Sequence, residues 1–312
     1  MLYIVGHKNP DTDSICSSIV LSHFLDAIPA RLGDLNPESE FILKRFGVME
    51  PELITSAEGK ELILVDHSEK SQSLEDLDKG KIVGIIDHHK VGIITSEPII
   101  YIAKPLGSTA TILGELYFKK MMEFIGGKNK ELKEDLAGLL LSAIISDTVL
   151  FKSPTTTNTD RNIAERLAKI AGIGDINAYG MEILKAKSTV GSMKPEEIVN
   201  LDYKEFNFAG KKIGIGQVEV IDTDEIESKK EEIYNILEEK INMGYDLILF
   251  LITDIMKEGS EILVVGNRKA FERAFNVELK DKSIFLEGIM SRKKQVVPPL
   301  ERYYKNKQNI EQ

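Results

Sequence analysis

LYIVGH, at residues 2–7, decides the fold: four apolar residues run into a glycine and a histidine. A short, continuous apolar run of this kind predicts a strand buried on both faces of a sheet. Two later runs have the same form. The run at 62–65 ends in Asp-His, and the run at 82–86 ends in Asp-His-His. Because ligands bind beyond the carboxyl ends of parallel strands, the pattern predicts one polar, ligand-binding edge.

Helical patterns alternate with these apolar runs and predict an α/β fold, in which a mainly parallel sheet is flanked by helices. Asp13 or Ser14 is the expected N-cap of the first helix, because both side chains accept hydrogen bonds from a first turn. The predicted helices of this half are Ser14–Leu25, Ser108–Phe124, Glu131–Ser146, Asp160–Ala171 and Ile176–Lys187.

The chain has 312 residues, which is long for one hydrophobic core, so two domains are expected. The stretch 186–195 is polar, rich in small residues and closed by proline, as in a linker. We predict a metal-binding domain at 1–187, a linker at 188–194 and a smaller C-terminal α/β domain with a mixed sheet at 195–312. Its predicted elements are strands near Tyr203–Phe208, Lys212–Val218, Leu247–Thr253 and Glu261–Val265, and an acidic helix at Asp224–Asn242.

Charge and composition exclude several classes of protein. The net charge is −10, which argues against nonspecific nucleic-acid binding, although a local cluster of cations can still bind a small phosphate. No apolar run reaches the roughly 18–20 residues that a membrane span needs, so no membrane partner is expected. Cys16 is the only cysteine, which fits a reducing, cytoplasmic setting.

Histidines and aspartates gather where the predicted strands end, and they are the candidate metal ligands. Carboxylates and imidazoles without thiolates suit a hard or borderline ion such as Mn²⁺, Mg²⁺ or Co²⁺. So many acids in one place would repel one another without cations between them, and their number suggests two ions. The candidates are His7, Asp11, Asp13, Asp66, His88 and Asp147.

Plainer readings of some of these residues remain open. Asp11 and Asp13 can be turn and cap residues, and His67 can support a ligand instead of being one. Asp87 can hold the tautomer of a liganding histidine. Asp147, at the end of an apolar helix, is disfavoured there by the helix dipole, which favours a functional reading. His23 lies inside a helix and reads as structural.

Five segments together resemble a known family. HKNPDTDS at 7–14, VDHS at 65–68, IDHH at 86–89 and SDTVLFKSPT at 146–155 look like the metal motifs of the DHH phosphoesterase superfamily. SRKKQVVP at 291–298 resembles the substrate-binding signature of family II inorganic pyrophosphatases. The resemblance runs from the first strand to the C-terminal tail, so it covers both predicted domains.

This resemblance implies roles for the residues. His7, Asp11 and Asp66 would bind a first Mn²⁺. Asp13, Asp66, His88 and Asp147 would bind a second, and Asp66 would bridge the two; Co²⁺ or Mg²⁺ can also fill such sites. His89, Lys204, Arg292 and Lys293 would contact the substrate. The family also implies a homodimer joined through the N-terminal domains and additional Mg²⁺ carried by the substrate.

The expected reaction is hydrolysis of pyrophosphate to two phosphates by a hydroxide that bridges the two ions. Arg292 would give a planar, two-pronged phosphate contact and Lys293 a point charge. If the segment is extended, Lys294 points away from Lys293. The alternatives are an exopolyphosphatase or a short-oligonucleotide phosphodiesterase of the same superfamily. A non-enzymatic metal-dependent binding protein is a further alternative, and it predicts missing ligand residues.

Overall fold

The computed structural model describes residues 1–188, 190–221 and 223–311. The chain divides into two compact units, Met1–Lys187 and Ser188–Gln312. The predicted linker at 188–194 contains residue 189, which lies outside the described residues; its later part forms the 3₁₀ turn η4 (Val190–Ser192). Within the described part of the chain, no helix has the length and apolar character that crossing a bilayer requires.

The first unit is built on a six-stranded sheet in which every pair of neighbours is parallel, with the order β3-β2-β1-β4-β5-β6. This confirms the predicted parallel sheet. β1, β4 and β5, which are neighbours in the sheet, contain the three apolar runs noted in the sequence. The strands are β1 (Leu2–Val5), β2 (Ile28–Arg31), β3 (Glu52–Leu53), β4 (Glu61–Val65), β5 (Lys81–Asp87) and β6 (Ile100–Ala103).

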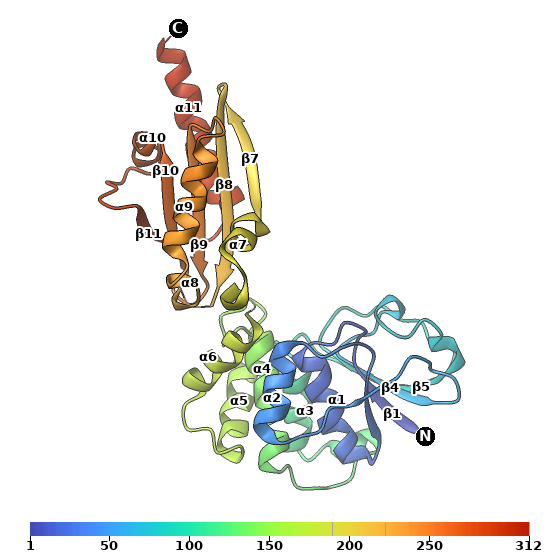
Figure 1. Ribbon diagram of the computed structural model, residues 1–312. Coiled ribbons are helices and arrows are strands. Elements are labelled where there is room, and N and C mark those ends of the chain that lie inside the picture. Colours follow the sequence, from blue (N-terminus) through green and yellow to red (C-terminus); the bar gives the residue numbers. More distant parts are fainter. Residues whose placement is uncertain (189, 222, 312) are drawn as a thin grey trace. The chain divides into compact units, whose positions relative to one another are not determined.

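Helices cover one face of this sheet, and loops with short 3₁₀ turns cover the other. Figure 1 shows α1 (Thr12–Leu25), α3 (Thr109–Phe118) and α4 (Glu134–Asp147) stacked on one side of β1, β4 and β5. The other face packs against Ile54, Leu74 and Leu77, which come from loops and short 3₁₀ turns. The remaining helical elements are α2 (Pro37–Phe46), η1 (Lys70–Gln72), η2 (Leu77–Lys79), η3 (Met122–Ile125), α5 (Asn158–Ile170) and α6 (Ile176–Lys187).

Several helix boundaries differ from the prediction; for example, α4 begins at Glu134 and not at Glu131. The first helix begins at Thr12 and not at Ser14, because the side chain of Asp11 is the N-cap and accepts a hydrogen bond from the backbone N–H of Ser14. Asp13 therefore lies inside the first turn. The helix predicted at Ser108–Phe124 ends at Phe118, and a separate 3₁₀ turn follows it.

The second unit contains a mixed sheet, as predicted; it has five strands in the order β11-β10-β9-β8-β7, and β11 was not among the predicted strands. β8 and β9 are parallel, and the other neighbours are antiparallel. α9 packs on one face and α11 on the other. The elements are α7 (Pro195–Leu201), β7 (Tyr203–Phe208), β8 (Lys211–Val220), α8 (Asp224–Glu227), α9 (Lys230–Ile241), β9 (Leu247–Asp254), β10 (Gly259–Gly266), α10 (Arg268–Phe275), β11 (Ser283–Glu287), η5 (Arg292–Val296) and α11 (Val297–Glu311).

The acidic stretch predicted as one helix at Asp224–Asn242 is two helices, α8 and α9.

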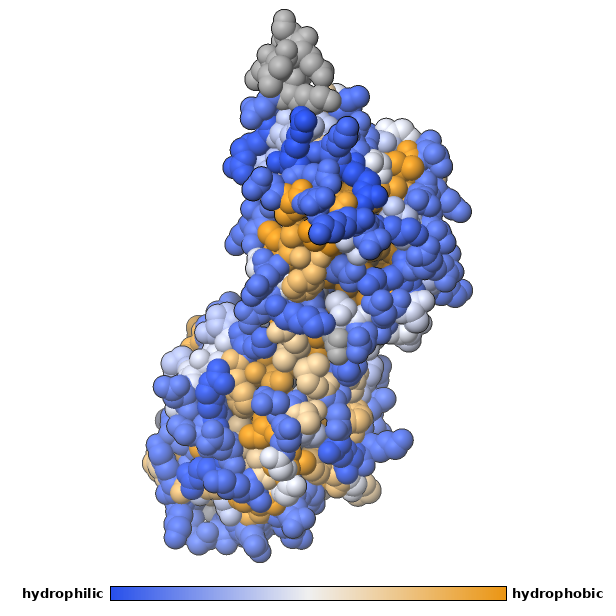
Figure 2. All heavy atoms as spheres, turned by 90° about the vertical axis from the view of Figure 1, so that its left-hand side faces the viewer, coloured by the Kyte–Doolittle hydropathy of each residue, from blue (hydrophilic) through white to orange (hydrophobic). Residues whose placement is uncertain are grey.

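The visible surface of each unit in Figure 2 is a mixture: hydrophilic side chains surround patches of apolar side chains.

Candidate metal centre

The predicted ligands come together at the carboxyl edge of the parallel sheet. His7 follows β1, Asp66 follows β4, and His88 follows β5, and these three strands are adjacent in the sheet. Asp11 and Asp13 lie at the start of α1, and Asp147 is the last residue of α4.

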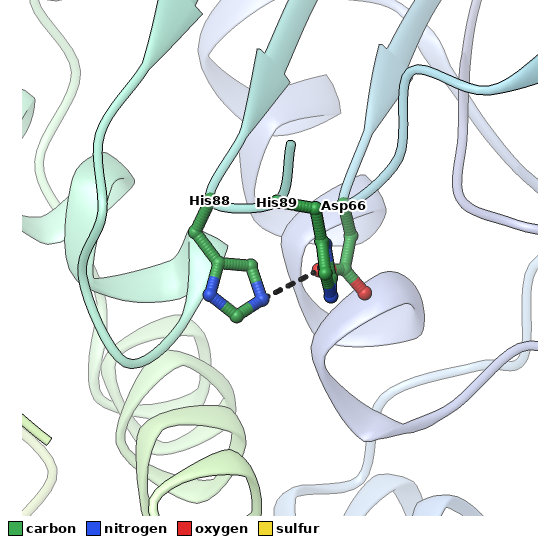
Figure 3. Close-up of side chains that lie close together, drawn as sticks. All are labelled: Asp66, His88 and His89. Atoms are coloured by element: carbon green, nitrogen blue, oxygen red, sulfur yellow. Dashed lines mark ion pairs between the residues drawn. The ribbon is translucent and has the colours of Figure 1, made fainter. Parts of the chain in front are cut away.

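Among the residues that the structure describes, three overlapping groups of side chains have the spacing that a metal ion requires. In each group the nitrogen and oxygen atoms that could bind an ion lie within 4.8 Å of one another. Asp66 is a member of every group, and it lies beside His88 and His89 in Figure 3. The groups are His7 with Asp11 and Asp66; Asp13 with Asp66, His88 and Asp147; and Asp66 with His88 and His89.

His7 lies between two carboxylates. Its Nε2 atom is 3.5 Å from Asp11 Oδ2 and 3.5 Å from Asp66 Oδ2. Burial alone lowers the pKa of His7, but hydrogen bonds and charge interactions with Asp11 and Asp66 outweigh burial and raise the pKa to about 10. At neutral pH the His7 imidazole of the ion-free protein is therefore protonated, and its positive charge lies beside the carboxylates of Asp11 and Asp66.

His88 has the same role at the second group. Its Nε2 atom lies 3.3 Å from Asp66 Oδ1 and 3.6 Å from Asp147 Oδ2. Burial opposes the charged form, but the hydrogen bond and charges of Asp66 and Asp13 raise the pKa of His88 to about 9. Nδ1 donates a hydrogen bond to the carbonyl oxygen of Leu106 at 2.9 Å, so Nε2 is the atom left to bind an ion once the ring is neutral.

Asp13 is held at the N-terminus of α3. Its carboxylate accepts hydrogen bonds from the backbone N–H of Thr109 at 2.6 Å and of Ala110 at 2.9 Å, and from the Ser108 hydroxyl at 2.9 Å. Burial and the negative charge of Asp66 raise the pKa of Asp13 to about 7. The expected N-cap role at α1 is wrong for Asp13, which instead accepts hydrogen bonds from the first turn of α3, a helix whose own N-cap is Ser108.

Asp66 is buried in a left-handed backbone conformation, with φ of 63°, which L-residues other than glycine seldom adopt. Its carboxylate accepts hydrogen bonds from Ser14 Oγ at 2.9 Å and from Thr109 Oγ1 at 3.2 Å. Burial disfavours its charge, yet hydrogen bonds from His7 and His88 hold the pKa of Asp66 well below its usual value. The charged, fixed Asp66 carboxylate thus lies between the two histidines.

Asp147 precedes an unusual turn. Val149, Leu150 and Phe151 all have positive φ, at 47°, 52° and 66°, although none is glycine. The turn is fastened by backbone hydrogen bonds from Val149 to Ser146 and from Leu150 to Ile145. Burial and the charges of Asp13 and Asp66 raise the pKa of Asp147 well above its ordinary value. The Asp147 carboxyl group at the end of α4 therefore favours its neutral form unless a cation lies beside it.

His67, Asp87 and His89 also lie at the carboxyl edge of the parallel sheet, at or just after the ends of β4 and β5. Asp87 Oδ1 accepts hydrogen bonds from His89 N and His89 Nδ1, both at 3.0 Å, so Asp87 orients a histidine. His67 Nδ1 donates to the carbonyl oxygen of Val65 at 2.9 Å, and burial lowers the pKa of His67. The structure places His67 outside the three groups found among the described residues.

A cavity of about 450 Å³ opens beside the centre. His7, Asp11 and Asp66 form part of its wall, and His67 and His89 form another part. A small polyanion placed there would contact the ligand side chains directly. Asn9, Ser68, Glu69, Gln72 and Lys90 complete the lining.

The predicted substrate-binding cations lie in the second unit. Arg292 is only 7% exposed; its guanidinium donates to the backbone carbonyl oxygen of Asp202 at 2.6 Å and to the Asp202 carboxylate at 2.9 Å. Lys204 on β7 and Lys293 are exposed. The segment 292–296 is a π-helical turn, so the extended backbone on which the expected alternation of Lys294 with Lys293 depended is not present there.

The donor set fits divalent cations. It consists of carboxylate oxygens and imidazole nitrogens, and three buried or part-buried acids, Asp13, Asp66 and Asp147, converge on one point. His88 Nε2 is buried, and among the described residues its polar contacts include the carboxylates of Asp66 and Asp147, at 3.3 and 3.6 Å. A cation here would relieve the repulsion between the acids and would pair with this nitrogen.

Several supporting residues escaped the sequence analysis. Ser14, Ser108 and Thr109 hold the carboxylates of Asp13 and Asp66. Ser108 carries a weak sequence signal, because a serine before an apolar helical pattern is a typical N-cap. Glu38 is buried and accepts a hydrogen bond from Ser146 Oγ at 3.0 Å, next to Asp147, and nothing near it in sequence indicates that contact.

Comparison with known proteins agrees with this architecture. The DHH family, N-terminal domain, matches residues 1–144, and the DHHA2 domain matches residues 181–303. The fold and the site thus define a two-domain protein of the DHH class.

Relatives identify the family within this class. A manganese-dependent inorganic pyrophosphatase of Methanocaldococcus jannaschii is 72% identical over 305 residues, covering 97% of this chain and 99% of the relative. One from Methanothrix thermoacetophila is 41% identical over 315 residues, covering 97% and 98%. A crystal structure of a Methanococcus jannaschii protein assigned to the family II inorganic pyrophosphatases has 72% identity and a TM-score of 0.65, covering 98% and 100%. The chain belongs to the family II, manganese-dependent inorganic pyrophosphatases, as the sequence motifs indicated.

Proposed function

We propose that this protein hydrolyses inorganic pyrophosphate to two phosphates, using two Mn²⁺ ions held at the carboxyl edge of the parallel sheet. The family membership supports the activity. One observation supports the paired ions: Asp66 belongs to every ligand group, and its two oxygens contact different histidines, with Oδ2 3.5 Å from His7 Nε2 and Oδ1 3.3 Å from His88 Nε2.

The proposed ligands divide between the two sides of Asp66. His7, Asp11 and Asp66 hold the first ion. Asp13, Asp66, His88 and Asp147 hold the second. When bound, the paired ions would lower the pKa of a shared water and so supply hydroxide at neutral pH.

The first unit then binds and orients the substrate. His89 faces the cavity, and Asp87 accepts its Nδ1–H, so the remaining ring nitrogen, Nε2, is the atom available to a phosphate oxygen. Protonated His89 can donate a hydrogen bond there, and the proximity of Asp87 raises the pKa of His89 in favour of that form. His89 is thus a hydrogen-bond donor that lines the cavity proposed for the substrate.

We also propose substrate-binding roles for three cations of the second unit, as the family resemblance implies. Lys204, Arg292 and Lys293 would neutralise charge that grows on the leaving phosphate and on the equatorial oxygens. Lys204 and Lys293 are exposed and free to reach an anion as point charges. Arg292 is already oriented by Asp202, so its contribution would come from a guanidinium whose plane is fixed.

We also propose the finer properties implied by the family resemblance. Co²⁺ or Mg²⁺ can replace Mn²⁺ at a site of oxygen and nitrogen donors, and additional Mg²⁺ would enter with the substrate. The buried Cys16 fits the predicted cytoplasmic setting. A homodimer would form through the first unit, where β6 is an edge strand and the adjoining segment exposes Val91 and Ile94.

Phosphate release tests the proposed activity. With Mn²⁺ present, pyrophosphate should be cleaved far faster than tripolyphosphate or a short oligonucleotide. Asp66→Asn should reduce the rate by more than about 100-fold while leaving the circular dichroism spectrum unchanged, because it weakens both ion sites at once. Preference for tripolyphosphate or for the oligonucleotide would instead assign one of the alternative activities. Undiminished turnover by Asp66→Asn would remove the paired-ion mechanism.

A further inference from the structure

Three polar side chains interrupt an apolar face of the sheet in the second unit. Alternate residues of a strand share a face, and on this face the residues next to the polar ones are Ile215, Leu251 and Ile262, all fully buried. The polar residues that continue the same rows are Gln217 on β8, Thr253 on β9 and Ser260 on β10, and all three are buried.

These side chains form a chain of hydrogen bonds with one direction. Gln217 Nε2 donates to Thr253 Oγ1 at 2.9 Å. The Thr253 and Ser260 hydroxyls are 2.8 Å apart, and Ser260 Oγ donates to the carbonyl oxygen of Ile289 at 2.6 Å. Because the Ser260 hydrogen is used by Ile289, Thr253 must be the donor between the two hydroxyls. The chain therefore runs from Gln217 to the backbone of Ile289.

Gln217 also contacts the backbone directly at two further points. Its Nε2 donates to the carbonyl oxygen of Met290 at 3.1 Å, and its Oε1 accepts from the backbone N–H of Arg292 at 3.2 Å. The buried chain thus ends on three backbone atoms of the segment 289–292. Burying polar groups is unfavourable unless they are paired, and here the pairing is with that one segment.

The same segment is held from its other side by Gln295. Gln295 Oε1 accepts from the backbone N–H groups of Met290 and Ser291, both at 2.9 Å, and its Nε2 donates to the carbonyl oxygen of Gly288 at 2.6 Å. Residues 288–291 belong to no helix or strand. Hydrogen bonds from the side chains of Gln217, Ser260 and Gln295 therefore pair backbone groups that a helix or a sheet would otherwise pair.

We propose that Gln217, acting with Thr253 and Ser260, is a positioning residue for the phosphate contacts of Arg292 and Lys293. The inference rests on the proposed function, in which those two cations bind pyrophosphate. Gln217 holds the backbone of Arg292 while Asp202 holds its guanidinium, so the π-helical turn that carries Lys293 begins from a fixed point.

Gln217→Met tests the inference, because methionine keeps the length of the side chain and removes its amide. We expect the KM for pyrophosphate to rise by about tenfold or more, with a smaller change in kcat, because a displaced cation costs mainly substrate binding. Bound manganese should stay at the wild-type level. Hydrogen–deuterium exchange should become faster in the peptide 288–296 and remain unchanged elsewhere.

Two substitutions at Thr253 serve as a matched pair. Thr253→Ser keeps the hydroxyl and should retain the wild-type KM, whereas Thr253→Val has nearly the same shape, breaks the chain and should raise the KM. Ser283→Ala is the control: it removes a hydroxyl that bonds to Glu261 on the same sheet at 2.7 Å and does not reach residues 288–292. If Gln217→Met does not fold, the Thr253 pair decides the question.

Wild-type KM and wild-type exchange in Gln217→Met, or equal KM values in the two Thr253 variants, overturn the inference. Failure of the proposed function has a different signature. In that case the wild-type protein releases no phosphate from pyrophosphate, or Arg292→Ala leaves the KM unchanged. Faster exchange at 288–296 in Gln217→Met would then still support the positioning of the segment.

Discussion

At the scale of single residues, the centre depends on histidines that carry charge when no ion is bound. His7 and His88 lie within salt-bridge distance of Asp66, and these contacts raise the pKa of each ring, to about 10 and about 9. A metal ion binds only the neutral imidazole, so each ring must lose its proton before it becomes a ligand.

Binding of Mn²⁺ should therefore release protons. At neutral pH we expect at least two protons per chain to be displaced, one each from His7 and His88, and more from Asp13 and Asp147, whose pKa values are also raised, so the apparent affinity for Mn²⁺ should rise with pH. Titration calorimetry in buffers with different ionisation enthalpies measures that number. His7→Gln should reduce it by about one. A binding enthalpy that does not depend on the buffer would contradict the protonated state assigned to these rings.

The ligand candidates could be found from the sequence because each lies beside a strand or helix end that its own neighbours predict. His7, Asp66 and His88 all follow apolar runs. Their supporting contacts could not be found in this way. Ser108 reaches Asp13 across 95 positions and Ser146 reaches Glu38 across 108, and no local pattern encodes contacts at such separations.

At the scale of elements, the turn after α4 is the part of the site with the greatest backbone strain. A left-handed conformation costs an L-residue roughly 1–2 kcal/mol, and a β-branched residue such as Val149 is rarer there than most. The strain is located directly after Asp147, where hydrogen bonds to α4 hold the turn in place.

Val149→Gly should relieve this strain. We expect the free energy of unfolding of the ion-free protein to rise by about 1 kcal/mol, because glycine adopts positive φ without steric cost. Denaturant unfolding measures the change. Val48→Gly is the matched control, since Val48 is also partly buried and outside regular structure but has no positive φ, and this variant should lose stability. A loss of stability in both variants would show that the Val149 turn is not strained.

The sequence predicted regular elements better than their ends. The predicted start of α1 is wrong because Asp13 or Ser14 was the expected cap, whereas Asp11 is the cap and Asp13 bonds to α3. The π-helical turn at Arg292–Val296 has no periodicity of its own. Its shape depends on Gln217 and Gln295, which bond to the backbone at its start.

At the scale of the whole molecule, the parallel sheet ends in an open edge. In the order β3-β2-β1-β4-β5-β6, β6 has a neighbour on one side only, and unpaired edge strands favour association. The preceding segment exposes large apolar side chains: Ile94 is 99% exposed and Val91 is 64% exposed. These features support the proposed dimer through the first unit.

Ile94→Lys should weaken that dimer, because a charged side chain would be buried at the proposed contact. Sedimentation velocity should show a shift toward the monomer. Met49→Lys is the control, since Met49 is 87% exposed in the same unit but lies near β3 at the opposite edge. A wild-type monomer, or an Ile94→Lys protein that remains fully dimeric, would refute an interface at this edge.

Asp66 belongs to all three candidate ligand groups, and this limits how the protein can change in evolution. Replacement of Asp66 removes a ligand from both proposed ions, so it cannot lead to a protein that keeps one of them intact. Replacement of Asp11 or Asp147 removes a ligand from one side only. A descendant that works with a single ion would therefore arise by losing an outer ligand, and Asp66 should be the last of the acids to vary.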